Sequence, residues 1–143
     1  MSDTPTATGS CLCGAVSYRV DGPLRQVVTC HCRECRKQTT HFMAFTGAWK
    51  DQLAVQGEEA LRWYRSGAHS RRGFCATCGS FLFFDVDGRE TISIGAGSLD
   101  RHPELRLQQH MWLAEKGAYY TVDDDARHDA GGGIDVPMPP KQG

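Results

Sequence analysis

The sequence lacks an excess of charge of either sign and lacks any long apolar run. Its formal net charge is −1 over 143 residues, and acidic and basic residues are mixed without a basic block. Nucleic acid and anionic membranes are therefore not expected as partners. No stretch approaches the roughly 20 apolar residues that a transmembrane helix needs.

The first ten residues, MSDTPTATGS, lack the basic start and apolar centre of a secretory signal. We therefore expect a reducing, cytoplasmic setting, in which clustered cysteines bind metal rather than pair with one another. The seven cysteines are an odd number, which complete disulfide pairing cannot accommodate. A chain of this length can also bury a core without cross-links.

Long amphipathic helices and internal repeats are absent as well. The chain consists of short alternating or β-branched segments, which predict a mainly β fold class. One or two short helices are expected, at about 33–39 and at 98–105. The candidate strands are residues 15–20, 26–29, 42–46, 52–57, 61–66, 81–86, 89–97, 105–113 and 118–124.

The clearest element is a predicted β-hairpin centred on Asp87-Gly88. This pair lies between two apolar, β-branched runs, and an Asp-Gly pair in that position favours a type I′ turn. The polar residues 1–8 are expected to be loose, residues 9–127 to form one zinc-binding domain, and the glycine- and proline-rich residues 128–143 to form a tail.

The cysteines fall into three groups, a C-x-C pair, a C-x-C-x-x-C triplet and a C-x-x-C pair. The spacing of Cys75 and Cys78 fits a zinc knuckle, in which Gly79 supplies a positive-φ turn. Cys11 and Cys13 can also converge, because residues i and i+2 of a strand point to one face. The two pairs therefore predict one four-cysteine zinc site.

Cys30, Cys32 and Cys35 then remain as a separate set of three. The other division, with four ligands taken from this triplet and the later pair, leaves the first pair without a purpose. A redox role is an alternative, although thioredoxin-type pairs lie in a βαβ unit that is not visible here. Three protein ligands with an exchangeable fourth position are typical of catalytic zinc. Because three thiolates on Zn²⁺ carry a formal −1 charge, such a site favours an incoming thiol over hydroxide.

Several motifs together resemble the glutathione-dependent formaldehyde-activating enzyme family, which includes the centromere protein V relatives. The resemblance extends over about residues 9 to 122 and rests on order and spacing as well as on the cysteines. The matching segments are GSCLCGAVSYRV, CHCRECRKQTTHF, RWYRS with RRGFCATCGS, GAGSLD, and a histidine followed by AEKGAYY.

The resemblance implies a β-tent-like fold of antiparallel sheets built around a structural zinc. By motif match, that zinc would be held by Cys11, Cys13, Cys75 and Cys78. The zinc assigned to catalysis would be held by Cys30, Cys32 and Cys35. The implied activity joins formaldehyde to glutathione as S-hydroxymethylglutathione. Thr40 departs from the family pattern, because many relatives have glycine there.

Two histidines lie near the triplet. On an extended backbone His31 points away from the ligands on either side of it, so we expect it to support them or to lie at the surface. His41 could complete the open zinc site of the triplet, act as an acid–base group, or be a polar residue at the start of a strand. The tripeptide Asp123–Asp125 is expected to be a solvated turn.

Basic residues could bind the carboxylates of an anionic thiol such as glutathione. The candidates are Arg36 and Lys37, with Arg71 and Arg72 as further possibilities, although basic residues are more often simply solvated. The large aromatic residues are expected in the core rather than at a ligand; they are Trp63, Tyr64, Phe74, Phe81, Phe83 and Trp112.

The leading hypothesis is a zinc-dependent carbon–sulfur lyase of the formaldehyde-activating type, with a small-molecule thiol and aldehyde as partners. The thiol would bind zinc as a thiolate and attack the carbonyl, and His41 would donate a proton to the alkoxide. The alternative is a non-catalytic, zinc-stabilised protein-binding module. Thiol redox chemistry at the triplet is a third hypothesis, and the substrate and oligomeric state stay open.

Overall fold

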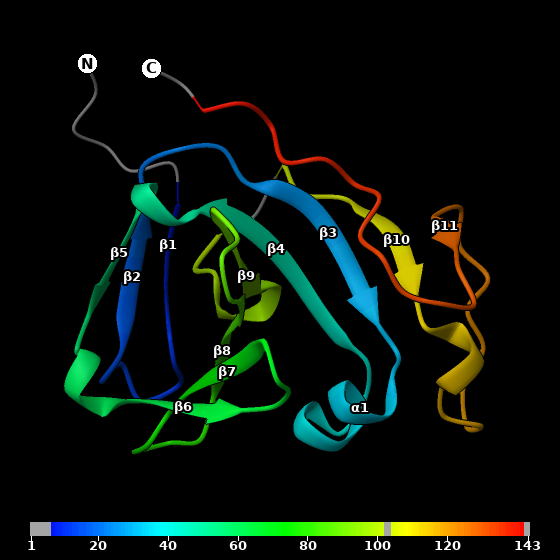
Figure 1. Ribbon diagram of the computed structural model, residues 1–143, viewed down its shortest axis with the longest axis horizontal. Helices are drawn as coiled ribbons and strands as arrows, with labels where there is room; N and C mark the ends of the chain where they lie inside the picture. Colours follow the sequence, from blue (N-terminus) through cyan, green and yellow to red (C-terminus); the bar gives the residue numbers. More distant parts are fainter. Residues whose placement is uncertain (1–6, 102–103, 142–143) are drawn as a thin grey trace.

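The computed structural model describes residues 7–101 and 104–141, and it is mainly β, as predicted (Figure 1). A small sheet has the strand order β1-β2-β5 and a large sheet the order β11-β10-β3-β4-β9-β8-β7-β6. The strands of the small sheet are β1 (Ala7–Ser10), β2 (Ser17–Val20) and β5 (Leu53–Gln56). Those of the large sheet are β3 (Arg25–Cys30), β4 (Met43–Trp49), β6 (Leu61–Arg65), β7 (Ser70–Cys75), β8 (Phe81–Val86), β9 (Thr91–Gly95), β10 (Leu107–Met111) and β11 (Arg127–His128).

The predicted helix at 33–39 is confirmed as α1 (Arg33–Thr39). Short 3-10 helices connect several strands: η1 (Lys50–Gln52), η2 (Glu58–Ala60), η3 (Ala96–Ser98) and η4 (Leu113–Glu115). The helix considered at 98–105 falls partly on residues 102–103, which lie outside the described residues. Within the described part of the chain, no helix combines the length and the apolar character needed to cross a membrane.

Not all strand pairs are antiparallel, in contrast to the expectation from the family. β10 runs parallel to β3 and to β11, whereas the other pairs of both sheets are antiparallel. The topology explains this difference. β9 and β10 run in the same direction, and the segment between them crosses the sheet, so β10 arrives beside β3 in the direction of β3.

The predicted hairpin forms between β8 and β9, but its turn is not of type I′. The amide of Arg89 donates to the carbonyl of Val86, and Gly88 has a φ of 80°. Asp87 does not have a positive φ, and a type I′ turn needs positive φ at both central residues. A positive φ at the second central residue alone is the pattern of a type II turn.

The predicted strand at 118–124 is not formed. The Lys116 ammonium group donates to the carbonyls of Gly117 and Tyr120, at 3.1 and 2.6 Å, which folds this segment on itself. The Tyr120 side chain is then directed at His31, with the hydroxyl 2.5 Å from Nδ1. The local backbone therefore follows a side-chain contact rather than its strand propensity.

Two hydrophobic cores lie on either side of β4 and β9, and each contains one group of cysteines. The first core lies between the small sheet and the large one, and includes Cys11 and Cys75 with Val16, Tyr18, Val20, Leu82, Phe83 and Ile94. The second core includes Cys30 and Cys35 with Val28, Met43, Phe45 and Met111. The two cysteine groups are therefore separated by the fold as well as by the sequence.

The C-terminal segment, expected to be a tail, lies along the large sheet and returns toward the side of the N-terminus (Figure 1). Ile134 and Val136 pack against the second core. The Trp49 indole donates to the carbonyl of Pro139 at 2.9 Å, and Lys141 forms an ion pair with Asp51. Ile134 thereby lines the cavity at the cysteine triplet, whereas the later residues lie along the other end of β4.

Helix α1 ends at Thr40, which is in the left-handed region at a φ of 67°. Its amide donates to the carbonyl of Arg36 and so closes the last turn. Glycine is the usual residue at such a position, and a β-branched residue is strained there. The departure from the family pattern at Thr40 therefore has an energetic cost.

We predict that Thr40→Gly stabilises the protein by about 1 kcal/mol, because it removes the Cβ strain of the left-handed conformation. Urea unfolding at a fixed zinc concentration measures this effect. Thr39→Gly is the comparison variant, and it should destabilise by about 1 kcal/mol, because it removes the hydrogen bond that the Thr39 hydroxyl donates to the carbonyl of Cys35. A loss of stability in Thr40→Gly would contradict the assignment of strain to this residue.

Candidate metal and thiol sites

The four cysteines Cys11, Cys13, Cys75 and Cys78 converge, as their spacing predicts. Their sulfur atoms all lie within 4.8 Å of one another. The Cys11–Cys13 and Cys13–Cys75 sulfur separations are 3.7 and 3.8 Å. A tetrahedral site with Zn–S bonds of about 2.3 Å requires separations of about 3.8 Å. This cluster could therefore hold a metal ion with little adjustment.

Two tight turns aim backbone amides at these sulfurs. Gly14 and Gly79, the residues that follow Cys13 and Cys78, have φ values of 81° and 80°. The amides of Thr77 and Cys78 donate to the sulfur of Cys75 at 3.3 and 3.5 Å. These contacts fix the position of the Cys75 sulfur in the cluster.

The triplet also converges, with all three sulfurs within 4.8 Å of one another. Cys30 ends β3, Cys32 is the N-cap of α1, and Cys35 lies in its first turn. The Cys35 amide donates to the sulfur of Cys32 at 3.4 Å. Cys30 and Cys35 are buried, and Cys32 is half-buried.

The three thiols perturb one another strongly. Hydrogen bonds from the Cys30 and Cys35 side chains lower the pKa of Cys32, with backbone amides adding to the effect. Contacts with Cys32 and Cys35, together with burial, raise the pKa of Cys30. The group therefore favours one thiolate when no cation is present, and a divalent cation is what would allow all three.

A cavity of about 270 Å³ opens onto the triplet. Its apolar wall comes from β4, β8, β10 and the C-terminal segment, with Met43, Phe45, Phe84, Met111, Trp112 and Ile134. Trp112, predicted to be in the core, is instead 39% exposed and has a φ of 58°. This left-handed conformation is strained for a bulky residue, and such strain is concentrated at functional sites.

Arg72 of β7 contacts the triplet. It is buried, and both of its terminal nitrogens lie 3.7 Å from the sulfur of Cys35. Gln38 accepts a hydrogen bond from it at 2.9 Å, and Glu34 lies 3.6 Å away. The positive charge of Arg72 offsets the negative charge of the thiolates.

A second cavity, of about 360 Å³, adjoins the first and shares Glu34 and Arg72 with it. Arg33 and Lys37 also line it, so three basic side chains face one space. Tyr64, predicted to be in the core, lines this cavity and is 62% exposed. Arg36, the other basic residue proposed from the sequence, lines neither cavity, and its Nε is buried without a hydrogen-bond partner among the residues that the structure describes.

His31 is fully buried and points away from the two cysteines beside it, so the surface alternative is wrong. Its Nε2 lies 2.9 Å from the hydroxyl of Thr29. Burial lowers its pKa to about 4, and the nearby His110 and His41 add to this shift.

His41 lies in a group of aromatic rings rather than in the lining of either cavity. Its Nδ1 is 2.6 Å from the hydroxyl of Tyr119. The structure thus brings together each of the two cysteine sets and places Lys37 in the cavity that adjoins that of the triplet. Sequence reasoning missed the contact of Arg72 with Cys35, because 37 residues separate the two and no local pattern links them.

The fold and these two clusters define a mainly β protein with two candidate metal centres made of cysteine. The chain belongs to the glutathione-dependent formaldehyde-activating enzyme family, whose sequence profile matches residues 6–115.

The chain is also similar to two relatives and to one solved structure. An uncharacterized lyase of Schizosaccharomyces pombe is 33% identical over 131 residues, which cover 84% of this chain and 94% of that protein. A Halomonas elongata protein, named as a candidate glutathione-dependent formaldehyde-activating enzyme, is 29% identical over 80% of each chain. The crystal structure of a Rhodobacter sphaeroides protein superposes with a TM-score of 0.55 at 25% identity, and covers 71% of this chain and 99% of that one.

We predict that Arg72→Met weakens metal binding at the triplet by about 10- to 100-fold, the usual cost of losing a charged group beside the ligands. Competition with a chromophoric chelator measures this affinity. Arg71→Met is the matched control, because the Arg71 guanidinium stacks on Trp63 and pairs with Asp85, away from the cysteines. Equal affinities in the two variants would contradict the role of Arg72.

Proposed function

We propose that the protein is a zinc-dependent carbon–sulfur lyase of the formaldehyde-activating type, which joins a thiol such as glutathione to a small aldehyde or reverses that addition. The observation that carries this proposal is the triplet at the cavity floor, which gathers three sulfurs and, among the described residues, no fourth ligand group. Family membership, the lyase name of one relative and the formaldehyde-activating name of another support it.

In this proposal the two cysteine clusters have different roles. Cys11, Cys13, Cys75 and Cys78 hold a structural zinc, since four sulfurs complete a tetrahedron. The catalytic zinc belongs to the triplet of Cys30, Cys32 and Cys35. When bound there, zinc supplies a cation that lowers the pKa of a substrate thiol at its open position.

The side chains around the triplet compensate charge and exclude water. Arg72 offsets the charge of the thiolates, and its Nε has no hydrogen-bond partner among the described residues, so it keeps a donor for a ligand. The apolar wall excludes water, which would compete with the thiol for the aldehyde. The substrate sulfur then forms a bond to the carbonyl carbon as the C=O π bond breaks to give an alkoxide.

The second cavity provides a site for the rest of an anionic thiol. Arg33 and Lys37 line it together with Arg72, and guanidinium and ammonium groups bind carboxylates well. We assign this role to these residues ahead of Arg36, which lines neither cavity. Glutathione, which carries two carboxylates and a thiol, fits this division into a basic space and a thiol-binding space.

For the proton that the alkoxide takes up, we propose His41 as the source. Its ring is hydrogen bonded to the exposed hydroxyl of Tyr119. Because His41 and Tyr119 line neither cavity, the transfer requires a water molecule as an intermediary. All seven cysteines are free, which supports the proposal of a reducing, cytoplasmic location.

We predict different outcomes for one cysteine of each cluster. Cys35→Ser should leave a folded protein that lacks one zinc and has no activity, because its cluster lies at a cavity. Cys78→Ser should unfold the protein or make it insoluble, because the structural zinc ties β1 and β2 to β7. Circular dichroism and zinc counting by native mass spectrometry measure both effects, and identical behaviour of the two variants would contradict the division of roles.

We further predict that zinc-replete protein accelerates the exchange between formaldehyde, glutathione and their adduct, and that Cys35→Ser abolishes the acceleration. NMR exchange spectroscopy measures this rate directly. Lys37→Ala should raise KM for glutathione but not for 2-mercaptoethanol, which has no carboxylate, whereas Lys50→Ala, in η1 away from both cavities, should change neither.

The competing hypotheses have their own outcomes in these experiments. A single tightly bound zinc, with no acceleration for any thiol and aldehyde pair, would favour the non-catalytic binding module. Rapid alkylation of the triplet in the zinc-loaded protein would favour thiol redox chemistry, since zinc-bound thiolates are protected from it.

A further inference from the structure

A third group of ligand atoms is separate from both cysteine clusters. It consists of His110 of β10, Asp124 of the following loop and His128 of β11, with one ligand atom from each within 4.8 Å of the others. We propose that these residues bind a divalent first-row transition metal such as Zn²⁺, which clamps the segment 121–130 onto the large sheet.

The backbone itself brings the two histidines together. His110 and His128 are directly opposite each other in the parallel pair of β10 and β11, so their side chains project from the same face. Their ring centroids are 5.4 Å apart. β11 is only two residues long, so strand pairing alone stabilises the segment 121–130 only weakly.

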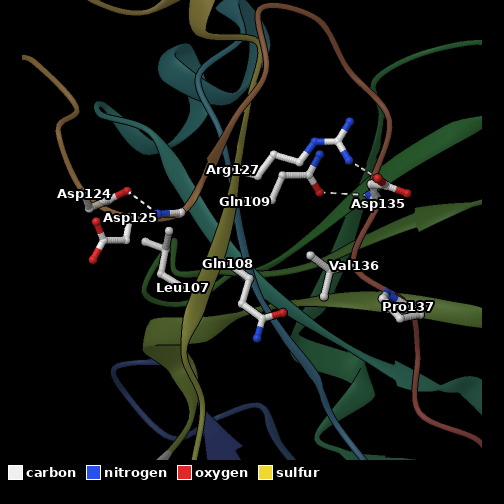
Figure 2. Close-up of a pocket in the computed structure, with 10 residues that line it drawn as sticks. Leu107, Gln108, Gln109, Asp124, Asp125, Arg127, Asp135, Val136 and Pro137 are labelled. Carbon is white, nitrogen blue, oxygen red and sulfur yellow. Dashed lines mark hydrogen bonds and ion pairs between the residues drawn. The ribbon is translucent and has the colours of Figure 1, made fainter.

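Asp124 lies between the two rings. One carboxylate oxygen is 2.8 Å from Nε2 of His110, and the other is 3.3 Å from Nε2 of His128. A tetrahedral ion with bonds of about 2.1 Å would require ligand separations of about 3.4 Å, so small movements would admit it. Figure 2 shows Asp124 at the edge of a surface cavity, where the amide of Ala126 donates to its carboxylate.

A network behind His110 can support either tautomer of its ring. Thr29 lies 2.6 Å from Nδ1 of His110 and 2.9 Å from Nε2 of His31, whose Nδ1 faces the hydroxyl of Tyr120. Without metal, Tyr120 donates to His31, His31 to Thr29 and Thr29 to His110, and the Nε2–H of His110 donates to Asp124. With every donor reversed, Nδ1 of His110 carries the proton and Nε2 is free to bind a cation.

This reversal leaves no nitrogen of the network without a hydrogen bond or a metal. A metal-binding histidine normally donates its other N–H to a neighbouring oxygen, and the buried Thr29 hydroxyl provides that acceptor. Two imidazoles and one carboxylate are ligands that suit zinc and its neighbours in the first transition row. Water would complete the coordination, because His128 and Asp124 are open to solvent.

The proposal is tested by zinc counting on the full-length, zinc-replete protein. The wild type should hold one more zinc than His128→Gln or Asp124→Asn, with a dissociation constant in the micromolar range or tighter. Both residues are exposed at the surface, so both variants should fold, which circular dichroism checks. His69→Gln is the matched control, an exposed histidine on another loop, and should keep the wild-type count.

Co²⁺ as a probe separates this site from the cysteine clusters. The difference spectrum between wild type and His128→Gln should lack the thiolate-to-cobalt charge-transfer bands, because no sulfur is lost. Zinc should also slow amide hydrogen exchange at residues 127–129 in the wild type but not in the variants. These readouts do not depend on activity, so they stand or fall separately from the proposed lyase function.

Three results would overturn the proposal. One is an equal zinc count in the wild type and in both variants. Another is binding of the additional zinc only in the millimolar range, which indicates an adventitious ion only. The last is a cobalt difference spectrum with thiolate bands, which would mean that the substitution acts on the cysteines.

Discussion

The close contact of sulfur atoms is the constraint on which the rest of the structure depends. Sulfurs 3.7 to 3.8 Å apart cannot all be thiolates without a cation among them, since like charges at that distance repel. Bringing them together therefore requires turns that admit positive φ, amides aimed at the sulfurs and, at the triplet, a buried arginine. The four-cysteine cluster lies in the core between the small sheet and the large one, so strands of both sheets converge on it.

The two clusters meet this constraint in different ways. The four-cysteine cluster is surrounded by backbone donors and belongs to the core between the sheets. The triplet has fewer sulfurs and relies on Arg72, which reaches it from a distant strand. Four sulfurs can complete a tetrahedral site, whereas three leave a position for another ligand, so the two clusters differ in what they could bind.

Much of the site was predictable because it is encoded locally. The spacing of Cys75 and Cys78, with Gly79 after them, predicts a knuckle whatever the surrounding fold, and the structure has that turn. The helix at 33–39 and the hairpin at Asp87-Gly88 are likewise short-range features. Where prediction failed, distant contacts decided the outcome. The strand predicted around Tyr120 does not form, because Tyr120 contacts His31 instead. Trp112 has a strained conformation beside the C-terminal segment.

The parallel pairing of β3 and β10 has a consequence for how the chain folds during synthesis. Thr29 and His110, which are paired across these strands, are 81 residues apart in the sequence. One edge of β3 therefore stays uncovered until most of the protein has left the ribosome, and exposed strand edges invite pairing with other chains. Contacts of such high sequence separation also slow folding. The cysteines at the end of β3 are thus translated early, while the strand beside them is completed late.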